Sequence, residues 1–232
     1  MIKDNLEVVE KNIRIACDRA GRDRKDVTLI AVSKTKPIED IREAIEEGIA
    51  VFGENKVQEL LDKTSTIKEN MSWHMIGHLQ VNKVKYLPGR VCMIHSVDNV
   101  RLAEEIDKRF SMYGQTIDVL VEVNMAEEDS KFGIAPDQTI DFVKGISTLS
   151  HLNIRGLMTI APYTENPESN RVYFKGLKGL MDKINGEHID GIKMDTLSMG
   201  MTGDYQIAIE EGATFIRVGT GIFGERDYNK TI

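Results

Sequence analysis

The stretch Val27-Thr28-Leu29-Ile30-Ala31-Val32-Ser33-Lys34-Thr35-Lys36-Pro37 contains the first strand-to-helix transition of the chain. Its first part is apolar and β-branched, which is typical of a strand buried on both faces. Pro37 then begins a segment whose isoleucines recur at helical spacing, and Gly48 ends that segment. The stretch therefore predicts a βα unit with Lys34 at the carboxyl end of its strand.

The same alternation of strand and helix patterns continues along the chain. A helical stripe that ends at Gly21 precedes the first strand. Later apolar runs cover residues 50–53, 73–76, 91–97, 117–123, 154–160, 194–197 and 214–218, and segments with apolar residues at helical spacing lie between them. Repeated βα units imply a parallel sheet with right-handed crossovers. About eight units in a chain near the ~250 residues typical of the fold predict a closed (β/α)8 TIM barrel with an extra N-terminal helix.

An open, doubly wound sheet is the alternative, because a miscount of one or two strands would produce it. No proline- or glycine-rich linker interrupts the pattern, so we expect a single domain over residues 1–232. A short helix is also expected over Val81–Leu87.

Composition narrows the class of protein. The chain carries 30 basic and 37 acidic side chains, a net charge of −7, which argues against a general nucleic-acid or membrane-surface binder. No apolar run approaches the ~20 residues that span a bilayer. The first residues form no secretory signal, and Cys17 and Cys92 form no C-x-x-C motif. We therefore expect a cytoplasmic protein, and nothing in the sequence demands more than a monomer.

Two glycine-rich segments predict a phosphate site. In (β/α)8 barrels, ligands bind at the carboxyl ends of the strands, and phosphate often binds after the last two. Ser198-Met199-Gly200-Met201-Thr202-Gly203-Asp204 and Arg217-Val218-Gly219-Thr220-Gly221 are expected to follow strands seven and eight. Their glycines let the backbone approach an anion, and a helix beginning near Asp204 would direct N–H groups to it. Ser198, Thr202 and Thr220 add hydroxyl donors.

Lys34 would lie beside this phosphate site, because strand one neighbours strand eight in a closed barrel. A lysine amine near a phosphate site suggests a Schiff base with pyridoxal 5′-phosphate, and burial or a nearby cation would make the amine more nucleophilic. Strand alternation places Lys34 on the same face as Ile30 and Val32, but the sequence does not say which face is interior. Lys36 is a competing amine, and an ordinary solvated lysine is the alternative.

Arg217 is a candidate partner for the cofactor ring. A guanidinium keeps its proton near neutral pH and can only donate hydrogen bonds. Facing a pyridine nitrogen, Arg217 would keep that nitrogen unprotonated and weaken the ring as an electron sink. A phosphate ligand or a surface ion pair are the other interpretations of this residue.

The histidines predict no metal site. His74 and His78 lie on a strand and the turn after it, where four residues span roughly 13 Å, too far for a shared ion. His95, His151 and His188 have no companions at ligand spacing.

The ordered motifs resemble those of the pyridoxal phosphate homeostasis proteins, relatives of the N-terminal barrel of alanine racemase. The motifs are residues 31–36, 52–55, 73–77, 79–83, 155–158, 197–204 and 217–228. The resemblance implies a barrel of the alanine-racemase type that binds pyridoxal 5′-phosphate. It assigns the Schiff base to Lys34, the pyridine nitrogen to Arg217, the sides of the ring to Asn55 and Met199, and the phosphate to Ser198, Thr202, Gly219 and Thr220. Lys131 matches a further basic position, and Thr202 stands where the family usually has serine.

The resemblance also implies a role in cofactor buffering, carriage or delivery, with transient contact with apo-enzymes and without robust turnover. Alanine racemase has a second domain that helps to complete its active site, and this chain ends shortly after strand eight. A weak racemase, transaminase or lyase using the same cofactor is the enzyme alternative. A barrel that binds another phosphorylated metabolite, with Lys34 as a charge partner, is the third hypothesis.

Overall fold

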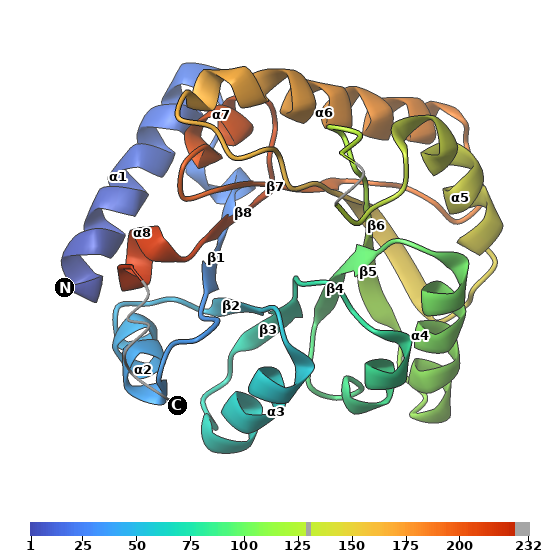
Figure 1. Cartoon of the computed structure of the whole chain (residues 1–232), viewed down its shortest axis with the longest axis horizontal. Coiled ribbons are helices and arrows are strands. Elements are labelled where there is room, and N and C mark those ends of the chain that lie inside the picture. The colour runs from blue at the N-terminus through green and yellow to red at the C-terminus, as the bar shows by residue number, and fades with distance from the viewer. Residues whose placement is uncertain (129–130, 226–232) are drawn as a thin grey trace.

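The computed structural model of the chain describes residues 1–128 and 131–225, which form a closed parallel barrel with an outer layer of helices (Figure 1). The strands follow in chain order around the barrel, and the last pairs with the first. They are β1 (Thr28–Val32), β2 (Val51–Glu54), β3 (Ser72–Met75), β4 (Met93–Val97), β5 (Ile117–Glu122), β6 (Leu152–Met158), β7 (Thr196–Met201) and β8 (Phe215–Val218). The predicted (β/α)8 barrel is confirmed, and the open sheet is excluded.

Helices alternate with these strands. They are α1 (Ile2–Ala20), α2 (Ile38–Glu46), α3 (Val57–Thr66), α4 (Val100–Met112), α5 (Thr139–Ile146), α6 (Arg171–Gly186), α7 (Tyr205–Glu210) and α8 (Thr220–Phe223). The extra N-terminal helix is α1, which lies beside α7 and α8 (Figure 1). It ends at Gly21, whose φ of 63° is the left-handed conformation that glycine adopts readily.

Two expected elements differ from the sequence prediction. Residues Val81–Tyr86 form a 3-10 helix, one of four such turns along with Arg24–Asp26, Pro136–Gln138 and Pro167–Asn170 in the part of the chain that is described. Strand seven was expected to end at Leu197, but β7 continues to Met201. Its pairing with β8 shifts register between Ser198 and Met201, where Gly200 has a φ of 90°. The glycine produces an irregularity within the strand and does not end it.

Two apolar layers fill the molecule. The main core lies between strands and helices and includes Ala31 of β1. A smaller cluster of Met93, Leu120 and Met158, with Phe215 packed against it, fills the barrel interior. Arg217 lies two residues beyond Phe215 on β8, so it shares the interior face, and it pairs in register with Ile30. This settles which face of β1 is interior: it is the face of Ile30.

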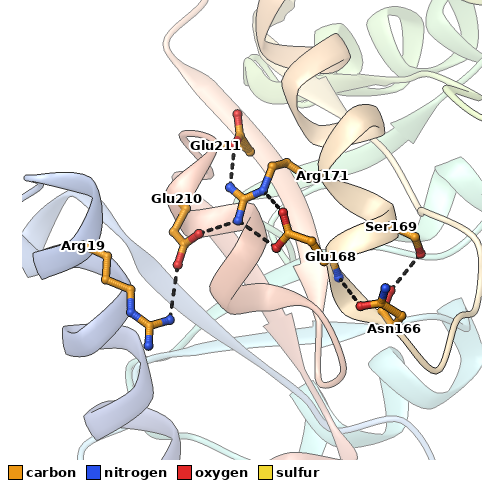
Figure 2. Close-up of polar contacts among 7 residues, drawn as sticks. All are labelled: Arg19, Asn166, Glu168, Ser169, Arg171, Glu210 and Glu211. Atoms are coloured by element: carbon orange, nitrogen blue, oxygen red, sulfur yellow. Dashed lines mark hydrogen bonds and ion pairs between the residues drawn. The ribbon is translucent and has the colours of Figure 1, made fainter.

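Ion pairs join the outer helices on one side. Arg171, at the start of α6, contacts Glu168, Glu210 and Glu211, and Glu210 also contacts Arg19 of α1 at 3.5 Å (Figure 2). The cluster therefore links α6, the end of α7, and α1. Among the residues that the structure describes, no helix combines the length and apolar character needed to cross a bilayer.

Candidate functional site

Lys34 lies half-buried in the turn directly after β1. Lys36 has a different environment, since its Nζ donates to the carbonyl oxygens of Phe223 at 2.9 Å and Gly224 at 3.2 Å. These bonds tie Lys36 to the end of α8 and give this amine a structural role.

The turns after β7 and β8 meet, as the sequence predicted. Thr220 Oγ1 lies 3.2 Å from Thr202 Oγ1, and the Gly221 amide donates to Thr202 Oγ1 at 3.3 Å. A Cβ at Gly221 would lie 2.9 Å from Val218 Cγ1, so only glycine fits without displacement. We call Thr202 together with Gly219, Thr220 and Gly221 the candidate phosphate site.

This candidate phosphate site adjoins the strand that carries Lys34. A Cβ on Gly219 would lie 3.3 Å from the carbonyl oxygen of Val32 at the end of β1. A cavity of about 180 Å³ borders it at Thr202 and is lined by Pro167 and residues 202–207. A larger cavity, of about 480 Å³, lies at the opposite end of the barrel, between α1 and the first residues of β1 and β2, away from Lys34.

Ser198 and Met199 do not lie in the turn after β7, contrary to expectation, because the strand extends past them. Both side chains are completely buried. Met199 belongs to the main core between strands and helices, and Ser198 lies in the barrel interior with Arg217. Both residues therefore precede the turn that carries Thr202.

Arg217 is buried in the interior, with 4% of its surface exposed, so it forms no surface ion pair. Its Nη1 donates to Ser198 Oγ at 2.6 Å and its Nη2 to the Thr159 carbonyl at 2.8 Å. Burial lowers the pKa of Arg217 to about 10, while the nearby Glu122 and Asp204 favour its charged form. The guanidinium is thus fixed, and it remains protonated near neutral pH.

A histidine pair extends this network, which the sequence analysis missed. His74 Nδ1 lies 2.9 Å from His95 Nε2, and His95 Nδ1 lies 2.9 Å from Ser198 Oγ. Burial lowers the pKa of His74 to about 4 and that of His95 well below its usual value, so both rings are neutral. The described residues contain no group of three potential metal ligands. The contact between the two histidines depends on the register of β3 and β4, which pairs His74 with Met93, two residues before His95.

Asn55 follows β2, and its Oδ1 is buried without a hydrogen-bond partner among the described residues. Gly77 lets the Asn55 backbone approach closely, because a Cβ at position 77 would lie 2.6 Å from the Asn55 carbonyl oxygen. Lys131 forms an ion pair with Glu128 at 3.1 Å in the segment after β5. Residues 226–228, the end of the last sequence motif, lie outside the described residues.

Comparison with known proteins then decides the family. Residues 5–227 match the family model of the alanine racemase N-terminal domain. The chain belongs to this family. Within it, the chain is 46% identical to the pyridoxal phosphate homeostasis protein of Aquifex aeolicus, over 97% of this chain and 98% of the relative. The resemblance drawn from the sequence motifs is confirmed.

Two solved structures share the fold of this chain. PipY of Synechococcus elongatus, determined with PLP bound, is 32% identical with a TM-score of 0.83, over 97% of this chain and 100% of PipY. Alanine racemase of Clostridium difficile is 13% identical with a TM-score of 0.76, over 97% of this chain and 58% of the racemase. The second likeness shows a shared fold alone.

Proposed function

We propose that this protein binds pyridoxal 5′-phosphate as a Schiff base on Lys34 and serves in its intracellular homeostasis, by buffering, carriage or delivery. The observation that carries the proposal is the closure of β1 against β8. This closure sets the strand end that bears Lys34 beside Gly219 of the candidate phosphate site and pairs Ile30 with Arg217. The relatives named as pyridoxal phosphate homeostasis proteins and the PLP-bound PipY support it.

The residues present fit this cofactor. The glycines at 219 and 221 leave room where a Cβ would meet other atoms, and Thr202 and Thr220 supply hydroxyl groups for a phosphate. The Asn55 Oδ1 is a buried acceptor without a protein partner among the described residues. When bound, the cofactor supplies an aldehyde that condenses reversibly with an amine and a ring that withdraws electrons. Arg217, which stays protonated, would keep a ring nitrogen facing it unprotonated and so limit that withdrawal.

Carriage without robust turnover is the function that these residues support best. The neutral His74 and His95 are buried in contact with each other and with Ser198, so they are poorly placed to exchange protons with a substrate. The proposal includes a cytoplasmic monomer that contacts apo-enzymes transiently.

Glu122 favours a second candidate, a weak racemase, transaminase or lyase. Burial and the charge of Asp98 raise the pKa of Glu122 to about 7, a value suited to a general base. An enzyme of this kind would exchange the α-proton of an amino acid with deuterated water in the presence of the cofactor. The carrier proposal predicts no exchange above that of free cofactor.

The first experiment is borohydride reduction of the protein mixed with pyridoxal 5′-phosphate, followed by peptide mapping. We expect one stoichiometric pyridoxyl adduct on Lys34. Lys34→Ala should abolish the adduct, whereas the matched variant Lys36→Ala should keep it. Labelling scattered over several lysines, or none, would overturn the proposal and leave the candidate phosphate site to another phosphorylated metabolite.

A further inference from the structure

A buried group of charges lies beneath the Lys34 turn. Lys63 of α3 is 4% exposed, and its Nζ donates to the Ser33 carbonyl, to Glu54 Oε1 and to Glu59 Oε1, each at 2.7 Å. The three donors of the ammonium group are thus all used. Lysine and glutamate are rarely buried unless they are paired, and breaking such a pair is costly. We call Lys63, Glu54 and Glu59 the charge cluster.

The charge cluster holds the backbone on both sides of Lys34. Before it, the Ser33 carbonyl accepts from Lys63, and Ser33 Oγ donates to Glu54 Oε1 at 2.6 Å. After it, the Thr35 amide donates to Glu59 Oε1. The peptide groups next to Lys34 are therefore fixed by one connected set of hydrogen bonds. None of these hydrogen bonds involves a residue of the candidate phosphate site.

The turn that the charge cluster holds has an unfavourable backbone conformation. Thr35 has a φ of 63°, in the left-handed region that β-branched residues rarely adopt. Such residues persist where the surrounding contacts over-determine them, and they gather at ligand sites. Here the surrounding contact is the bond from the Thr35 amide to Glu59, which Lys63 in turn holds in place.

We propose that Lys63, Glu54 and Glu59 are positioning residues for Lys34, which fix its turn so that the amine reaches the cofactor in one orientation. The inference rests on the proposed function of Lys34. The charge cluster itself lies on the outer face of the barrel wall, since Glu54 pairs in register with Met75 of the main core. It acts through the backbone of the turn and does not touch the cofactor.

The test compares Glu59→Ala and Lys63→Met with the exposed Lys56→Met just before α3. Lys63→Arg is included as a conservative rescue. Glu59 has 20% of its side chain exposed, so its removal is tolerated better than that of Lys63 and decides the matter if Lys63→Met does not fold. Three quantities are measured: hydrogen exchange of the Thr35 amide without cofactor, the Kd for pyridoxal 5′-phosphate by absorbance titration, and the melting temperature.

We expect Glu59→Ala to speed Thr35 exchange and to raise the Kd, each by about tenfold, which corresponds to one lost charge-assisted hydrogen bond. Lys63→Met should do the same, Lys63→Arg should restore part of the loss, and Lys56→Met should change neither quantity. A lowered melting temperature with an unchanged Kd would overturn the inference and leave the charge cluster a purely structural device. If the unaltered protein gives no Lys34 adduct, the proposed function fails first, and the exchange measurement still shows whether the cluster fixes the turn.

Discussion

At the scale of single residues, Glu122 is the group whose protonation is most open to measurement. It ends β5, is 6% exposed, and its Oε2 has no hydrogen-bond partner among the described residues. Burial is the main cause of its raised pKa, Asp98 adds to it, and Arg217 opposes it. With a pKa of about 7, the carboxyl group is partly protonated near neutral pH.

We expect the contribution of Glu122 to the free energy of unfolding to fall as pH rises between about 4.3, where an unfolded glutamate ionises, and about 7. In this window the unfolded chain loses the proton while the folded protein keeps it, so ionisation favours unfolding. The full contribution is on the order of 3 kcal/mol. Urea unfolding at pH 5 and pH 8 measures this contribution: relative to the unaltered protein, Glu122→Gln should gain stability at pH 8 compared with pH 5, while the exposed Glu104→Gln should follow the unaltered protein. The same change between the two pH values in all three proteins would contradict the assignment.

The residues of the candidate site divide according to whether their position depends on local sequence or on strand register. The places of Lys34 and Gly219 near strand ends were predictable, because both residues follow apolar runs and strand ends share one face of the barrel. The contact of His74 with His95 and that of Lys63 with Glu54 depend on which residues of different elements meet. Sequence periodicity does not specify that register.

At the scale of the elements, close strand contact explains one glycine that periodicity alone would not. Gly156 of β6 pairs with Thr196 of β7, and a Cβ there would lie 1.8 Å from the Thr196 carbonyl oxygen. That oxygen belongs to the backbone and cannot turn aside. Gly156 therefore allows β6 and β7 to approach.

Gly156→Ala should lower the free energy of unfolding by about 3 kcal/mol, because an added methyl group forces the backbone apart. The matched control is Gly145→Ala in α5, where a Cβ meets no atom within 4 Å. Alanine there should raise stability by up to about 1 kcal/mol through helix propensity. Thermal or urea unfolding of both variants gives the comparison. A similar effect of the two substitutions would show that strand contact is not the cause.

Element ends were harder to predict than element types. The apolar runs located each strand because a strand covered on both faces needs them, whereas β7 was cut short at Leu197. Gly200 and Gly203 suggested a turn, but Gly200 lies within the strand, where a Cβ would lie 2.5 Å from the Ala208 Cβ of α7. Glycine is required at position 200 because α7 packs closely against it, and the sequence of β7 alone does not reveal that contact.

At the scale of the whole molecule, one hydrogen-bonded chain crosses the barrel interior. It runs from His74 on β3 through His95 on β4 and Ser198 on β7 to Arg217 on β8, whose other nitrogen bonds the carbonyl of Thr159 just after β6. The Arg217 guanidinium, which we propose faces the cofactor, is thus linked through Ser198 and His95 to the opposite wall of the barrel. Neutral histidines suit this place, since a charged ring would lie buried near a cation.

The buried histidines should therefore lower the free energy of unfolding as the pH falls. The folded pKa of His74 is lowered to about 4, so its stabilising contribution is complete above the unfolded pKa of about 6.5 and is lost as pH falls from there toward 4. Its loss amounts to on the order of 3 kcal/mol, and His95 shifts the same way. Glu122 acts in the opposite direction across part of this window, so the measurement belongs in the Glu122→Gln background. In that background, His74→Gln should reduce the loss of unfolding free energy between pH 6.5 and pH 4, measured by urea unfolding. The exposed His188→Asn should leave this loss as it is. An unchanged loss in the His74 variant would show that the buried hydrogen-bonded chain does not control stability in acid.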